Sequence, residues 1–325
     1  MKKHFKKLLL MALMAVMAVG LIACGTDKSD NESTKEEKTS VTITSLDASK
    51  NEIELGVPYN PKRIAILDLA CLDIIDELGV GDRVVGMAST SIDYLEKYSN
   101  DASIKNLGTI KEADLEAVME CEPDIIFIGG RLSKSYDALS EIAPVVYLAT
   151  DTNEGLVNSV SKNAKTIASI FGMEDKVDSL MSDFGARIDT IKKISSGKTA
   201  LVGMTTSGSF NLLGNDGRCS LIGVEAGFNN LTAAGSTSTH GNESSFETVV
   251  QQNPDYVFVM DRDSAISTAG AKTAKEIVEN ELVKTTDAYK NNHIIYLEHS
   301  NVWYTAEGGI QALDIMLTDL EKGLK

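Results

Sequence analysis

Two arginines stand at the same place in a segment that the chain contains twice. Residues 123–131 read PDIIFIGGR and residues 254–262 read PDYVFVMDR, so an apolar run is followed by Arg131 in one copy and by Arg262 in the other. A guanidinium group is always charged and presents a planar fork of donors, which suits it to paired anionic oxygens. A single arginine is usually a surface or salt-bridge residue, but recurrence in register favours a shared role in binding an anion.

Other residues in loops could reach the same place. Arg218 follows a strand and a glycine-rich turn in LLGNDGRCSLIG, and Lys111 lies on a loop before a helix in LGTIKEADLE. His240 lies in the polar loop STSTHGNESSFE, where a neutral imidazole could bind a metal or form hydrogen bonds. In VWYTAEGG, Tyr304 could be a ligand and Trp303 an aromatic wall. The alternatives are solvent exposure for the first three residues and packing at a domain edge for the aromatic pair.

The sequence contains none of the common catalytic signatures. A GxSxG elbow, a P-loop, a GxGxxG after the first strand and an HExxH are all absent. Cys71, Cys121 and Cys219 form no CxxC pair and are interpreted as isolated buried thiols.

The elements that must position these residues alternate between apolar runs and helical stretches. Runs such as RIAILDL, IIFIGG and YVFVMD are continuous, which is typical of strands covered on both faces of a parallel sheet. The region 154–195 is helical, and the apolar stripe of its second part predicts a stiff helix long enough to join two lobes. Ligands of open parallel sheets bind beyond the carboxyl ends of the strands, so Arg131 and Arg262 are predicted to face one cleft.

The first residues predict export and a lipid anchor. MKKHFKK is followed by an apolar run over 8–19, which is too short for a membrane-spanning helix, and then by LIAC, which is similar to a lipobox ending at Cys24. The alternative is an ordinary signal peptide with a chance cysteine. The polar stretch 25–40 predicts a flexible tether, and two acyl chains on Cys24 would hold the protein to the membrane outside the cytoplasm. The formal net charge of −16 disfavours nucleic acid as a partner.

We therefore predict an α/β protein with two Rossmann-like lobes, parallel sheets, a single long helix between the lobes and a ligand cleft between them. The predicted divisions are a signal peptide (1–23), the lipidated cysteine and tether (24–40), an N-terminal α/β lobe (41–153), a helical region with the inter-lobe helix (154–195) and a C-terminal α/β lobe (196–325).

Together these features resemble the substrate-binding lipoproteins of ABC importers, in the rigid-helix class that captures iron–siderophores and corrinoids. The resemblance covers essentially the whole chain after the signal peptide and rests on NPKRIAILDLACLDIIDELG, ADLEAVMECEPDIIFIGGR, SEIAPVVYL, NPDYVFVMDR and WYTAEGG. It extends most closely to the branch that binds ferric catecholate siderophores such as petrobactin. It implies a monomeric receptor, not an enzyme, that delivers a ferric siderophore to an ABC permease and holds iron only as part of that ligand.

The resemblance also implies roles for individual residues. In that branch, cleft arginines surround the anionic iron complex, and some members complete the iron coordination with a histidine and a tyrosine. The predicted ligand-binding residues are Arg131, Arg218, Arg262, Lys111 and Trp303, and the predicted iron ligands are His240 and Tyr304. Family members contact the permease through an acid on each lobe, which implies Asp73 in CLDIIDELG and, with a match that slips by one residue, Glu225 in GVEAGF.

Several other interpretations remain open. Haem, a corrinoid or a hydroxamate siderophore would suit the same fold, although a neutral complex would not need so much positive charge. A secreted metal-dependent enzyme could use His240, Tyr304 and Glu243, but these residues do not form a carboxylate–histidine cluster at ligand spacing. A purely structural surface lipoprotein would leave the duplicated arginines unexplained.

Overall fold

The computed structural model of this protein describes residues 38–233 and 237–325, and Lys38–Lys325 form one compact unit. The predicted signal peptide, Cys24 and most of the predicted tether lie outside the described residues. Within the described part, no helix combines the length and the apolar composition that crossing a membrane requires.

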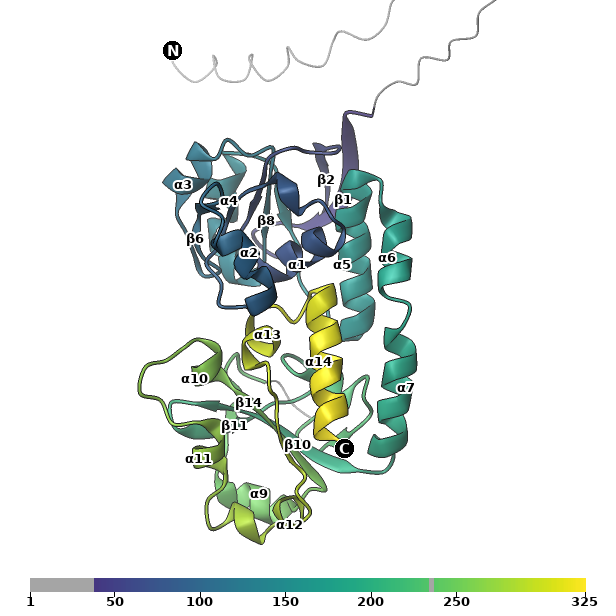
Figure 1. Ribbon diagram of the computed structural model, residues 1–325, viewed down its shortest axis with the longest axis vertical. Helices are drawn as coiled ribbons and strands as arrows, with labels where there is room; N and C mark the ends of the chain where they lie inside the picture. Colours follow the sequence, from purple (N-terminus) through teal and green to yellow (C-terminus); the bar gives the residue numbers. More distant parts are fainter. Residues whose placement is uncertain (1–37, 234–236) are drawn as a thin grey trace, which may run out of the picture. The chain divides into compact units, whose positions relative to one another are not determined.

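A parallel sheet forms the first half of the fold, and its strand order is β5-β4-β3-β8-β9. Figure 1 labels β8, the fourth strand in this order. Its strands are β3 (Ile64–Ile66), β4 (Val84–Met87), β5 (Lys105–Asn106), β8 (Ile125–Ile128) and β9 (Val145–Tyr147). Every residue of β3 and β8 is buried, which confirms the inference from continuous apolar runs.

Helices and a small hairpin surround this sheet. The helices are α1 (Leu69–Glu77), α2 (Glu96–Ser99), α3 (Leu115–Glu120) and α4 (Tyr136–Ser140), with 3-10 turns at Gly81–Arg83, Asp93–Leu95 and Gly130–Ser135. Strands β6 (Gly108–Thr109) and β7 (Glu112–Ala113) form an antiparallel hairpin whose turn holds Lys111. The sequence analysis placed Lys111 on a loop before a helix, and that helix is α3.

A second hairpin, which the sequence analysis did not predict, precedes the first sheet. Strands β1 (Ser40–Leu46) and β2 (Glu52–Pro58) pair antiparallel. The hairpin is tied to β9, because the Ser45 hydroxyl accepts a hydrogen bond from the Tyr147 N–H at 3.0 Å. The first strand of the described residues therefore begins at Ser40, the last residue of the predicted tether.

The second sheet is mixed, although a parallel one was predicted. Its order is β13-β11-β10-β14-β15, with β12 paired to β10. The strands are β10 (Thr199–Thr206), β11 (Ser209–Leu212), β12 (Asn229–Asn230), β13 (Asn242–Glu243), β14 (Tyr256–Asp261) and β15 (Ile294–Tyr296). β11 runs antiparallel to β10 because Ser207 and Gly208, with φ of 51° and 81°, turn the chain back in a two-residue hairpin loop, and β13 pairs antiparallel with β11.

Short helices and one 3-10 turn connect the strands of the second sheet. They are α8 (Ser220–Gly223), α9 (Phe246–Gln252), α10 (Arg262–Ala265), α11 (Ala274–Val278), a 3-10 turn at Val283–Thr285 and α12 (Asp287–Lys290). After β15 the chain forms α13 (Ser300–Thr305) and the closing helix α14 (Ile310–Gly323).

The helical region between the sheets consists of separate helices rather than the single long helix that was predicted. It contains α5 (Leu156–Phe171), α6 (Glu174–Leu180) and α7 (Phe184–Ser195). Gly172, at φ 67°, ends α5 in the left-handed conformation. Between α6 and α7 the Ser182 hydroxyl donates to the Ser179 carbonyl at 2.9 Å, a local bond that competes with helix continuation. The predicted apolar stripe is thus divided between α6 and α7.

One hydrophobic core connects both sheets with the helices between them. It includes Ile66 and Phe127 from the first sheet, Ile188 from α7, Phe258 from the second sheet and Leu313 from α14, all in a single cluster. Figure 1 shows α14 running beside α7, and Arg187 on α7 joins the two helices with bonds to Asp314, Thr318 and Glu321.

Two carboxylates, each far away in the sequence, cap the first turns of α14 and α5. Asp73 on α1 accepts hydrogen bonds from the Gln311 N–H at 3.0 Å and the Ala312 N–H at 2.9 Å. Glu225, which follows α8, accepts one from the Val157 N–H at 3.1 Å. Free N–H groups and the helix dipole make a helix N-terminus a favourable place for a carboxylate.

Candidate functional site

Tyr304 on α13 lies among the three arginines that the sequence singled out. The Cζ atoms of Arg218, Arg131 and Arg262 lie 4.4, 5.7 and 5.7 Å from the centre of the Tyr304 ring. Arg131 follows β8 and Arg262 follows β14, so equivalent strand ends of the two sheets supply this pair. The geometry agrees with the expectation that strand-end residues of both sheets face one place.

Hydrogen bonds fix the arginines in this arrangement. Arg131 Nη2 donates to the Tyr304 carbonyl at 2.9 Å, and Arg262 Nε donates to the Tyr304 hydroxyl at 3.2 Å. Arg218 Nη1 donates to the Thr239 carbonyl at 2.8 Å, beside His240. Arg262 also forms an ion pair with the buried Asp263 at 3.1 Å.

The positive charges change the acid–base properties of the neighbouring groups. Burial raises the pKa of Tyr304, but the hydrogen bond from Arg262 and the charges of Arg218, Arg262 and Lys111 outweigh it, so the pKa is lowered overall. Burial and then the same three positive groups lower the pKa of His240. A neutral imidazole and a phenol that loses its proton more readily are suited to bind a ferric ion.

A cavity of about 380 Å³ opens next to Tyr304. Arg131, Arg218, Tyr304 and two carboxylates, Asp68 and Glu307, contribute to its lining. Other parts of the lining come from the loop after β9, from α5 and, in the second half of the fold, from the segment around Arg218 and from Thr239, so both halves contribute.

The two carboxylates are functional candidates that the sequence analysis missed. Asp68 caps α1 by accepting from the Cys71 N–H at 3.1 Å, and Glu307 accepts from the Cys219 N–H at 2.9 Å. Burial raises the pKa of Glu307 to about 7, although the Cys219 bond and the nearby arginines act in the opposite direction. Asp68 follows β3 as Arg131 follows β8, so the strand-end argument could have identified it.

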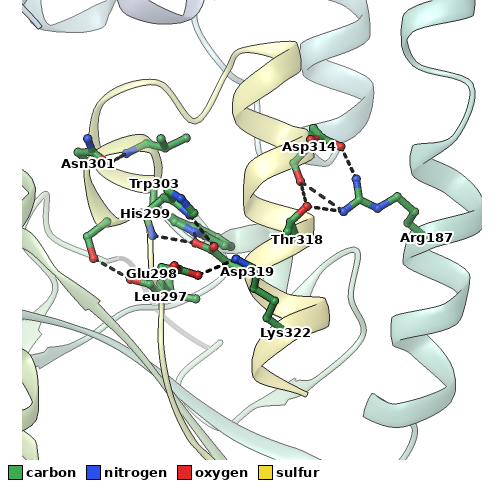
Figure 2. A network of polar contacts seen from close by, with 12 residues as sticks. Arg187, Leu297, Glu298, His299, Asn301, Trp303, Asp314, Thr318, Asp319 and Lys322 are labelled. Atoms are coloured by element: carbon green, nitrogen blue, oxygen red, sulfur yellow. Dashed lines mark hydrogen bonds and ion pairs between the residues drawn. The ribbon is translucent and has the colours of Figure 1, made fainter. Parts of the chain in front are cut away.

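Trp303 is not placed as predicted. Its side chain is completely buried, and Figure 2 shows its indole directed at Asp319, to which Nε1 donates at 3.0 Å. The same carboxylate accepts from the His299 ring at 2.7 Å. Because the Trp303 ring fills the core, it does not form a wall of the cavity, and its predicted role in ligand binding is corrected.

The predicted permease contacts are also corrected. Asp73 is fully buried, with its carboxylate bound to the Tyr94 hydroxyl at 2.6 Å and to the start of α14. Glu225 is partly buried and binds the start of α5. Carboxylates used to cap helices inside the protein do not form an exposed docking surface.

In the described part of the chain, the group of three or more His, Cys or acidic side chains whose ligand atoms lie within 4.8 Å of one another is Glu298, His299 and Asp319. His240, named for the alternative metal-dependent enzyme, does not belong to this group. Glu243, on β13, is exposed and does not belong to this group.

Residues 64–300 match the family described as periplasmic binding protein, and the chain belongs to this family. Its members are substrate-binding proteins. Among individual relatives, the petrobactin-binding protein YclQ of Bacillus subtilis (strain 168) is 36% identical over 330 residues, covering 98% of this chain and 99% of YclQ. The crystal structure of YclQ matches with a TM-score of 0.81 over 88% of this chain and 99% of that chain.

Two further proteins support the same assignment. The probable siderophore-binding lipoprotein YfiY of Bacillus subtilis (strain 168) is 28% identical and covers 99% of this chain and 98% of its own length. The periplasmic catecholate-siderophore binding protein VctP from Vibrio cholerae shares 30% sequence identity with this chain. Its crystal structure matches with a TM-score of 0.78 over 87% of this chain and 100% of that chain. The predicted two-lobed α/β fold is confirmed.

Proposed function

We propose that this protein is a receptor that binds a ferric catecholate siderophore, such as ferric petrobactin, outside the cytoplasm and delivers it to an ABC permease. The observation that carries the proposal is the convergence of Arg131, Arg218 and Arg262 on Tyr304. The names of YclQ and VctP, which describe a petrobactin-binding and a catecholate-siderophore binding protein, support it.

The charge of the ligand explains why three arginines would be used. Three doubly deprotonated catechols around a ferric ion leave a net charge of minus three, which three guanidinium groups balance. Charge-assisted hydrogen bonds to guanidinium are stronger than neutral ones and suit the paired oxygens of a catecholate. A neutral hydroxamate complex would gain little from the same groups.

Tyr304 and His240 are proposed iron ligands for a siderophore that supplies fewer than six donors. A bis-catecholate supplies four oxygens, which leaves two coordination positions for a phenolate and an imidazole. Both side chains lie in the field of Arg218, Arg262 and Lys111, which favours the phenolate and the neutral imidazole. Iron would be part of the cargo, and we propose no cofactor that belongs to the protein itself.

The cellular arrangement follows from the same proposal. Cys24 would carry the lipid anchor, the polar residues after it would be the tether, and the receptor would act as a monomer. YfiY is named a lipoprotein, which supports the anchor. With Asp73 and Glu225 used as helix caps, we assign no residue to the permease contact.

A titration with a matched panel tests the proposal. The chain from residue 24 onward, carrying Cys24→Ser, is titrated with ferric petrobactin, a ferric tris-catecholate, a neutral ferric hydroxamate, haem and cobalamin. Trp303, the one tryptophan of the sequence, adjoins Tyr304, so its fluorescence should be quenched when an iron complex binds. Tight quenching by the catecholates alone is expected. Preference for the hydroxamate or a macrocycle would overturn the role given to the arginines.

A further inference from the structure

The carboxylate of Asp319 on α14 holds the start of α13, the short helix that carries Tyr304. Its side chain is almost completely buried, and Figure 2 shows it directed toward Trp303 and His299. Among the described residues it accepts hydrogen bonds from the Trp303 Nε1–H and the His299 N–H, at 3.0 Å each, and from the His299 Nδ1–H at 2.7 Å. The three donors thus belong to α13 or to its N-cap residue.

Helix α13 depends on tertiary contacts for its position. It has six residues, whereas an isolated helix shorter than about 12–15 residues is marginal in water. Its N-cap residue, His299, forms no side-chain bond to the first turn. Asp319 therefore fixes the start of the helix from outside, and Arg131 fixes its end by donating to the Tyr304 carbonyl at 2.9 Å.

Trp303 transmits this restraint to Tyr304. The indole is completely buried and bound to Asp319, and Tyr304 is the next residue of the helix. Successive residues lie about 100° apart around a helix, so an indole that is fixed on one side sets the direction in which the phenol projects. Because the phenol oxygen lies at the far end of its side chain, a small rotation of α13 would move it away from Arg262 Nε, which is 3.2 Å distant.

We propose that Asp319 is a positioning residue, which places the Tyr304 phenol oxygen for binding to iron and so favours siderophores that leave coordination positions open. The inference rests on the proposed function, in which Tyr304 is an iron ligand. Bonds between a metal and its ligands tolerate errors of only about 0.2 Å, and removing the groups that orient a ligand typically lowers metal affinity about 10–100-fold. A ferric tris-catecholate fills all six positions with its own oxygens, so its affinity does not depend on Asp319.

The dissociation constants of two ligands test this role. The wild-type chain and its variants are titrated calorimetrically at pH 7.5 with a ferric bis-catecholate and with a ferric tris-catecholate. Asp319→Ala should weaken binding of the bis-catecholate at least tenfold and that of the tris-catecholate less than twofold. Asp314→Ala is the matched control, because Asp314 lies on the same helix but binds Arg187 on α7 and should leave both affinities unchanged (Figure 2).

Asp319→Asn is the conservative variant. Its amide oxygen can accept from the Trp303 indole and from the His299 N–H, and its amide nitrogen can donate to the His299 ring in the other tautomer. This variant should therefore bind the bis-catecholate as the wild type does. A loss as large as that of Asp319→Ala would contradict positioning by hydrogen bonds.

A double-mutant cycle shows whether Asp319 acts through Tyr304. In the Tyr304→Phe background, Asp319→Ala should cause no further loss of bis-catecholate affinity, because the oxygen that it positions is gone. A merely structural role predicts the same loss in both backgrounds, or equal losses for the two ligands, and either result would overturn the proposal. Should Asp319→Ala not fold, Trp303→Phe replaces it in the cycle, since it removes the indole N–H and keeps an aromatic ring in the core.

The outcomes also separate this role from the receptor proposal. If the wild-type chain binds neither ligand, the receptor proposal itself fails. If it binds both and Tyr304→Phe does not weaken the bis-catecholate, the positioning role is overturned together with iron ligation, while the receptor proposal stands.

Discussion

Tyr304 is bound at both ends by the arginines that surround it. Arg131 donates to its carbonyl and Arg262 to its hydroxyl, while Arg218 lies against the ring. The tyrosine thus keeps three mutually repelling cations together in the absence of ligand. Groups held in place beforehand lose little conformational entropy when a ligand arrives, which favours tight binding.

Among the three arginines, Arg218 gives the clearest test, because the Thr239 carbonyl is the one acceptor of its side chain among the described residues. Arg218→Ala should lower the affinity for a ferric tris-catecholate about tenfold to a hundredfold, since a hydrogen bond to a charged group contributes about 1.5–3 kcal/mol. Isothermal titration measures this. Lys290→Ala, a surface change of the same charge, is the control, and equal affinity in all three proteins would remove Arg218 from the site.

Iron ligation by Tyr304 has a spectroscopic signature. Tyr304→Phe should remove the phenolate-to-iron absorption band of the bound bis-catecholate complex and weaken its binding, because the iron loses a donor. A tris-catecholate supplies all six donors and should show neither change beyond the loss of the Arg262 contact. Tyr289→Phe is the matched control. Identical visible spectra of the wild-type and Tyr304→Phe complexes would exclude ligation.

The sequence predicted those residues of the site that directly follow a strand. The repeat around Arg131 and Arg262 identified two residues that the structure brings to one tyrosine. Trp303 was misplaced because adjacent residues of a helix point in different directions, so that Tyr304 faces the arginines while Trp303 faces Asp319. Glu307 was missed because its role depends on a cavity, which spacing along the chain does not show.

At the level of secondary structure, the buried carboxylate of Asp73 links α1 to α14. Burial raises its pKa to about 6, against the hydrogen bonds from Tyr94 and the first turn of α14. The folded pKa lies above the unfolded value of about 3.9, so folding favours the protonated form. The resulting contribution to stability is complete below about pH 4 and is lost as the pH rises through about 6.

The substitution Asp73→Asn replaces the carboxylate by an amide that does not take up a proton in this pH range. We expect the unfolding free energy of the wild type, minus that of Asp73→Asn, to decrease between pH 4 and pH 6 and to be constant above pH 7. Urea denaturation across this range measures it. Asp137→Asn, at an exposed position of α4, should show no such decrease. A difference that is independent of pH would contradict the raised pKa.

The sequence predicted helices and strands well where the spacing of apolar residues determines them. It predicted them poorly where the contacts of a single side chain determine where a helix ends. Continuous apolar runs located β3, β8 and β14. The apolar spacing over 177–191 did not show the break between α6 and α7, where the Ser182 hydroxyl donates to the Ser179 carbonyl. Asp73 was expected on an exposed helix face. Only the position of α14, which is set by tertiary packing, shows that this face is covered.

At the level of the whole molecule, the continuous core sets how the protein unfolds. Ile66, Ile188, Phe258 and Leu313 belong to one cluster that includes both sheets and the helices between them. We expect a single cooperative transition, with coincident urea curves from far-ultraviolet circular dichroism and from Trp303 fluorescence. Separate transitions would show that the lobes are independent folding units. Ligand should shift the one transition to higher urea concentration.

The two long-range helix caps, Asp73 on α14 and Glu225 on α5, have a consequence for fragments of this protein. The acceptor that completes the start of α14 comes from α1, and the acceptor for the start of α5 comes from the segment after α8. A chain cut between α7 and β10 would leave each piece with one carboxylate that lacks its helix and one helix that lacks its carboxylate. The two pieces should therefore complement each other when mixed, because each supplies what the other lacks.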